Sequence, residues 1–131
     1  MLFSSGALEN VFRDLDFVVE CHDDQTSEQM LDIIDKARRD RRLKNYDCFV
    51  CCVMSHGKEG HVFGSDGLPV AIKDMTSLLR PAYCPHFAGK PKIFFIQACQ
   101  GRTKRHRGKK VTQRIIKGRL VSFEVAQGLL K

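Results

Sequence analysis

The sequence predicts an α/β fold in which a mainly parallel sheet is flanked by helices. Two runs, 46–54 and 93–96, carry hydrophobic residues at consecutive positions, which is typical of strands covered on both faces. Segments with hydrophobic residues at helical spacing alternate with these runs along the chain. This alternation favours a sheet with a parallel core. The 131 residues are enough for one domain with its own core.

Three helices are predicted from hydrophobic spacing and capping residues. The first covers residues 7–15, where hydrophobic side chains recur every three to four positions. Thr26 and Gln29 have the spacing of a capping box at the start of the second helix. That helix is expected to end within 38–42, where arginines suit the negative end of the helix dipole. A short third helix is predicted over 74–79.

Shorter strands are predicted between these segments. Residues 17–19 form a brief hydrophobic run, and residues 61–64 and 68–72 predict a hairpin around the Asp66-Gly67 turn. We expect the first buried strand to end at Ser55-His56-Gly57 and the second at residues 97–101. No regular element is predicted after Gly101.

Charge divides the chain into two parts. Residues 1–101 carry twelve Lys and Arg against fourteen Asp and Glu, whereas residues 102–131 carry ten Lys and Arg against Glu124 alone. We therefore predict a domain over 1–101 and a flexible basic tail over 102–131. A solvated tail is favoured over nucleic-acid binding. No hydrophobic run approaches the roughly 18 residues of a membrane span, and Met1–Glu9 has no secretory signal pattern, so we expect a cytoplasmic protein without a membrane partner.

Three of the six cysteines, Cys48, Cys51 and Cys52, lie in one hydrophobic run. Cys48-x-x-Cys51 matches half of a zinc or redox motif. On a strand, positions three apart point to opposite faces, so one metal or one disulfide does not easily join them. The sequence has no second pair that would complete a zinc site. We expect these cysteines to be small buried hydrophobic residues and the chain to bind no metal.

A histidine and a cysteine follow the two buried strands. His56 comes after the first strand and Cys99 after the second. Ligands collect beyond the carboxyl ends of parallel strands, so an imidazole and a thiol could meet there and raise the reactive thiolate fraction. Gly57 allows close approach to its backbone, and the N–H groups of Gly57 and Cys99 could hold an oxyanion. A cysteine that serves packing alone remains an alternative on these residues.

The segment Gln97-Ala98-Cys99-Gln100-Gly101 matches the signature of the caspases, whose histidine is expected about 50 residues upstream. Ser55-His56-Gly57 fits that partner. Further segments that match the family are 48–57, 64–67 and 89–96. Over residues 6–101 the chain resembles the large catalytic subunit of a caspase. The glutamine at position 100 is similar to that of the death-receptor initiator branch of the family. The resemblance implies a three-layer sandwich.

The resemblance also implies roles for individual residues. Cys99 would be the nucleophile, His56 the general acid and base, and Gly57 with Cys99 the oxyanion donors. Gln97 would line the pocket for a substrate aspartate. The implied reaction is hydrolysis of protein substrates after aspartate, through a thioester and without a cofactor, in apoptotic signalling.

Two parts of the family pattern have no counterpart in this sequence. Family members begin the large subunit with a further strand and an Arg-x-Gly segment whose arginine binds the substrate aspartate, where this sequence has Met1–Ser5. The small subunit, which supplies a second such arginine, is also absent. We therefore expect an incomplete sandwich, little activity from this chain alone, and binding to a caspase small subunit or a full-length caspase. The alternative is a non-catalytic fragment that binds caspase subunits as a decoy or regulator.

Overall fold

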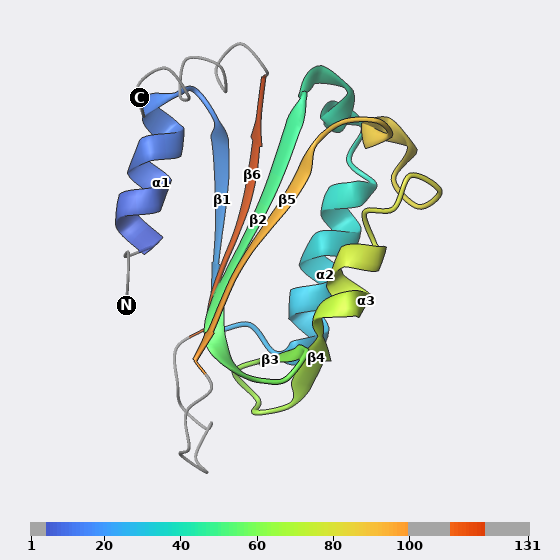
Figure 1. The fold of residues 1–131 in the computed structure, drawn as a ribbon. Helices are drawn as coiled ribbons and strands as arrows, with labels where there is room; N and C mark the ends of the chain where they lie inside the picture. The colour runs from blue at the N-terminus through green and yellow to red at the C-terminus, as the bar shows by residue number, and fades with distance from the viewer. Residues whose placement is uncertain (1–4, 100–110, 120–131) are drawn as a thin grey trace.

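The chain folds into three layers, with a sheet between two sets of helices (Figure 1). The computed structural model describes residues 5–99 and 111–119. Helix α1 (Ser5–Asp14) covers one face of the sheet, and α2 (Ser27–Arg38) and α3 (Ile72–Ser77) cover the other. Short 3-10 helices occupy Arg41–Asn45 and Pro85–Phe87. The prediction of an α/β three-layer sandwich is thus confirmed. In these described parts of the chain, every helix is too short or too polar to cross a bilayer.

In the described residues the sheet has six strands, and β2 lies at its centre. In chain order the strands are β1 (Val18–Asp23), β2 (Cys48–Lys58), β3 (His61–Phe63), β4 (Pro69–Ala71), β5 (Lys92–Cys99) and β6 (Thr112–Gly118). β6 and β5 flank β2, and β1 pairs with the outer side of β6. The end of β2 pairs with the β3–β4 hairpin, which contains the predicted Asp66-Gly67 turn.

The sheet is mixed, so the prediction of a mainly parallel sheet is wrong. Within 5–99 and 111–119, β2 and β5 form the one parallel pair, and the other pairs are antiparallel. β1, β2 and β5 nevertheless run in the same direction, as expected for strands joined by helical crossovers. The difference arises because β6 enters between β1 and β2 in the opposite direction, and because β3 and β4 form a hairpin.

β6 also corrects the prediction that no element follows Gly101. All seven residues of β6 are buried, although three of them, Gln113, Arg114 and Lys117, have strongly polar side chains. A search for hydrophobic periodicity misses such a strand because polar partners, rather than hydrophobic burial alone, accommodate its side chains.

Each face of β2 contributes to a separate core. Phe49, Cys51 and Val53 pack on the side of α2 and α3, whereas Cys48 and Cys52 pack with residues of α1. The cysteines are free and buried, which confirms that they act as small hydrophobic residues. Burial raises the pKa of the Cys52 thiol to about 11 and raises the pKa of Cys51 further, so both thiols stay protonated.

Helix α2 begins at the predicted capping box. The Thr26 hydroxyl accepts a hydrogen bond from the Gln29 backbone, and the Gln29 side chain accepts one from the Thr26 backbone. The Asp66 carboxylate of the hairpin turn accepts further bonds from the Ser27 backbone and hydroxyl. The hairpin is thereby joined to the start of α2.

We predict that Gly118→Ala destabilises the protein by roughly 1–3 kcal/mol, the usual cost of overpacking a core. A Cβ at Gly118 would overlap the ring of Phe17, which is itself buried. Urea unfolding with a reducing agent measures the effect. Gly6→Ala is the control, because a Cβ there meets nothing within 4 Å and alanine favours the helix. Equal stability of Gly118→Ala and the unsubstituted protein would contradict this packing.

Candidate active site

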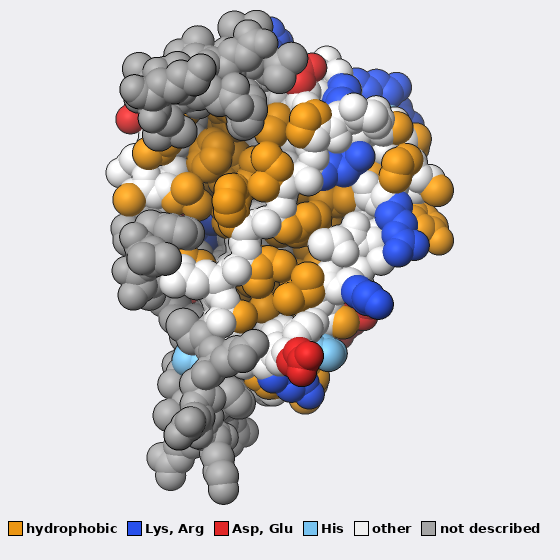
Figure 2. All heavy atoms as spheres, viewed as in Figure 1, with side chains coloured by type: hydrophobic (Ala, Val, Ile, Leu, Met, Phe, Trp, Pro, Cys, Tyr) orange, Lys and Arg blue, Asp and Glu red, His pale blue; other side chains and the backbone are white. Residues whose placement is uncertain are grey.

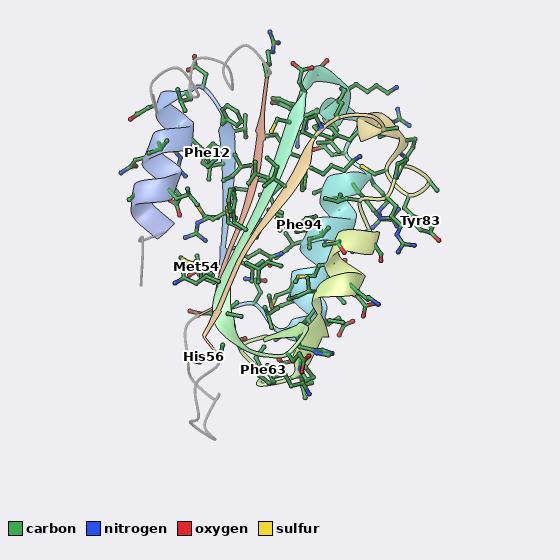
Figure 3. The ribbon with its side chains drawn as sticks, viewed as in Figure 1. Phe12, Met54, His56, Phe63, Tyr83 and Phe94 are labelled. Carbon is green, nitrogen blue, oxygen red and sulfur yellow. The ribbon has the colours of Figure 1, made fainter. Side chains whose placement is uncertain are left out.

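The β2–β5 ladder places the two predicted catalytic residues side by side. His56 and Cys99 are Cα partners at the last position of this parallel ladder, after Met54 with Gln97 and Ser55 with Ala98. Figure 3 shows His56 near the end of β2, next to the hairpin. His56 was predicted to follow its strand, but β2 continues to Lys58, so the imidazole is attached to a strand rather than a loop.

His56 lies on the face of the sheet that α1 covers. Side chains alternate along a strand, and His56 has the parity of Cys48 and Cys52, which pack in the core beneath α1. Figure 3 shows Met54 and His56 beyond the N-terminal end of α1, where the sheet continues without that helix. His56 is half-buried, and its Nδ1 atom is inaccessible to solvent. Water therefore does not reach this nitrogen of the imidazole.

Gln97 offers an unused hydrogen-bond acceptor near the same end of the ladder. Its Oε1 atom is buried and accepts no hydrogen bond from any residue that the structure describes. Buried side-chain oxygens nearly always have a partner, so this acceptor is suited to an N–H donor from a ligand. Gln97 pairs with Met54, two residues before His56, so the side chains of Gln97 and His56 lie on the same face of the sheet.

Gly57 is buried, and packing alone requires a glycine there. A Cβ at Gly57 would stand 2.6 Å from the Ala98 Cβ and 2.6 Å from the His61 carbonyl oxygen. These neighbours belong to β5 and β3, and they fill the space on the Cβ side of Gly57. They do not bear on the backbone N–H, so the expectation that a substrate approaches the backbone of Gly57 stays a prediction.

Ser55 is a supporting residue that sequence analysis did not single out. Its hydroxyl donates a hydrogen bond of 2.5 Å to the Phe63 carbonyl oxygen and joins β2 to β3 one residue before His56. The only sequence signal was its place in the Ser55-His56-Gly57 segment. This bond restrains the backbone that carries the imidazole.

No metal centre is found in the part of the chain that the structure describes: no three His, Cys, Asp or Glu side chains gather there. Two hollows are lined in part by residues of α2, and neither is lined by His56, Gly57 or Gln97. The candidate site thus lies at the end of the parallel β2–β5 pair, apart from these two hollows. Its chemistry is that of an imidazole next to a cysteine-bearing position.

Comparison with known proteins shows which family the chain is similar to. The Caspase domain family matches residues 5–124. Caspase-8 of Mus musculus is 45% identical over 95 residues, which are 72% of this chain and 20% of that protein. Caspase-7 of Gallus gallus is 42% identical over 97 residues (74% and 31%), and caspase-10 of Homo sapiens is 39% identical over 94 residues (72% and 18%). The chain spans 18–31% of the length of these relatives.

We predict that Gly57→Ala costs roughly 1–3 kcal/mol of stability, because two neighbours would have to move. Urea unfolding of Gly57→Ala, Ala98→Gly and the double variant forms a double-mutant cycle. The double variant removes one of the two overlaps, so we expect its loss to be smaller than the sum of the single losses. Additive losses would show that Ala98 does not restrict position 57.

Proposed function

Because the chain belongs to the caspase family of cysteine peptidases, we propose that it cleaves peptide bonds after aspartate with Cys99 as nucleophile and His56 as proton carrier. The observation that carries this proposal is the register of β2 and β5, in which His56 and Cys99 are partners. An imidazole beside a thiol supplies the base that a cysteine nucleophile needs. The buried Gln97 acceptor supports a role in binding the substrate.

In the proposed reaction, His56 takes the proton of Cys99. The thiolate then attacks the main-chain carbonyl carbon of the substrate aspartate, which belongs to the peptide bond that is cleaved. The backbone N–H groups of Gly57 and Cys99 donate hydrogen bonds to the oxygen that becomes negative. His56 then gives its proton to the departing amine, which leaves a thioester on Cys99. Water, activated by His56, hydrolyses the thioester and regenerates the thiol. No cofactor enters this sequence.

We propose that the isolated chain turns over substrate poorly. A substrate carboxylate that leaves water without a cationic partner loses several kcal/mol of binding free energy. Within the described residues, Gln97 makes no hydrogen bond or ion pair with an arginine or lysine that could serve as that partner. By family resemblance, the cations come from segments without a counterpart in this sequence.

We propose a caspase small subunit or a full-length caspase as the partner. β5 pairs only with β2 in the described chain, so its other side can accept a strand. Phe95 on β5 is 47% exposed, and Figure 2 shows hydrophobic side chains along the middle of this view of the molecule. The same open strand supports the second candidate function, a decoy or regulator that occupies caspase subunits in apoptotic signalling.

The Cys99–His56 pair predicts enhanced thiol reactivity at neutral pH. We expect Cys99 to react with iodoacetamide faster than Cys21, an exposed thiol of the same chain that serves as the internal reference. His56→Ala should slow the reaction of Cys99 at pH 7 by about tenfold, because the imidazole no longer stabilises the thiolate. The pH dependence of the rate should shift to higher pH for the same reason. Peptide mass spectrometry measures both rates. An unchanged Cys99 rate in His56→Ala would contradict the proposed pair.

The purified chain should show negligible turnover of a fluorogenic peptide that ends in aspartate. Addition of the small subunit of caspase-8 from Mus musculus should increase turnover, and Cys99→Ala should abolish the increase. Robust turnover by the chain alone, lost in Cys99→Ala, would contradict the expected low activity. Failure of the chain to co-purify with the small subunit or with full-length caspase-8 would contradict the proposed partner.

A further inference from the structure

β6 occupies a space between two strands that do not pair with each other. β1 and β2 run in the same direction, and β6 runs opposite to both. Residues 112–117 pair with β1, and residues 112–118 pair with β2. Among the residues that the structure describes, this late segment therefore supplies every backbone ladder between β1 and the rest of the sheet. Backbone ladders alone accept almost any strand, so selectivity must come from side chains.

On the face covered by α1, the residues around the space between β1 and β2 select a cation at one position of the strand and a glycine at another. The guanidinium of Arg114 is 6% exposed and donates hydrogen bonds to Glu9 of α1 and to Asp23 of β1, the latter at 2.8 Å. Four positions further on, the ring of Phe17 leaves room only for the hydrogen of Gly118. A strand with an uncharged residue at the first position would leave Asp23 without its cation, whereas Glu9 would keep its ion pair with Arg13.

On the opposite face, the space recognises an amide and a second cation. The Gln113 side chain donates to the Met30 carbonyl oxygen at 3.1 Å. The ammonium of Lys117, 3% exposed, lies 3.6 Å from Asp40 and 3.9 Å from Glu20. A hydrogen bond from Arg42 lowers the pKa of Asp40 to about 2, so this carboxylate is ionised at neutral pH. Four carboxylates thus lie next to the two cations of the strand, and two of them also pair with other cations of the chain, Glu9 with Arg13 and Asp40 with Arg42.

The ends of the segment are also fixed by named contacts. The Asp24 backbone donates to the Val111 carbonyl oxygen at 2.8 Å, and the Asp24 carboxylate accepts from the Val111 backbone. At the other end, the Asp47 backbone donates to the Gly118 carbonyl oxygen at 2.8 Å. These contacts determine the register of residues 111–118 within the space.

We propose that the space between β1 and β2 is a β-strand-binding site selective for a cationic segment, and that it exchanges its own residues 111–118 for those of a second copy of this chain. A second copy supplies the same Gln113, Arg114, Lys117 and Gly118, so it satisfies every contact described above. Exchange of identical elements between copies is a low-cost route to dimers. The inference concerns the sheet and does not depend on the peptidase proposal.

Charge reversal in the full-length chain separates the two roles of each copy, which are to supply the strand and to supply the site that binds it. Arg114→Glu gives a chain whose strand is repelled by its own acidic site, and Glu9→Arg with Asp23→Arg gives a chain whose site repels its own strand. When the two are mixed, each site meets a strand of opposite charge in the other copy. Carrying all three substitutions on one chain restores the match within that chain and is the control.

We expect the two complementary variants to form a species of twice the 14.9 kDa chain mass, about tenfold more abundant than in either variant alone or in the triple variant. Native mass spectrometry of differently tagged chains measures it. If each variant alone is unfolded, circular dichroism after joint refolding provides the second measurement, and a gain in strand signal over separate refolding supports the exchange. A mixture that remains monomeric, or that gains no structure on joint refolding, would overturn the proposal.

Discussion

The register of the β2–β5 ladder is the constraint on which the candidate site depends. Eight consecutive pairs connect Phe49 with Lys92 at one end and His56 with Cys99 at the other. A shift by one residue would move every β5 side chain to the opposite face, because strand side chains alternate with a period of two. The hydrophobic residues of β2 are buried on both faces and resist such a shift. The same packing that stabilises the core thereby sets the position of the imidazole.

The centre of the sheet combines hydrophobic and ionic packing. β5 and β2 pair through largely hydrophobic side chains, whereas β6 brings buried Arg114 and Lys117 into the same sheet. Buried ion pairs contribute little net stability once desolvation is counted, but loss of one partner leaves a costly unpaired charge. The acidic residues around β6 therefore act mainly on which strand is accepted. Stability in this region comes from Ile115 and Ile116, which are fully buried.

Local signals in the sequence were sufficient for the helices and the hairpin. The Thr26–Gln29 capping box and the Asp66-Gly67 turn depend on neighbouring residues, and both are present in the structure. β6 could not be predicted in this way, because its partners Glu9 and Asp23 lie far away in sequence. At the site, His56 and Cys99 followed from strand ends and from the caspase signature. The packing around Gly57 and the unused oxygen of Gln97 required the folded arrangement.

The buried cysteines have a consequence for how the molecule fails on heating. Burial raises the pKa values of Cys48, Cys51, Cys52 and Cys84, which suppresses thiolate formation while the fold is intact. Once the chain opens, these sulfurs regain ordinary acidity and can cross-link with one another and with other chains. Melting under oxidising conditions will then be irreversible and dependent on scan rate. The lifetime of the fold in air is accordingly governed by its opening rate rather than by its equilibrium stability.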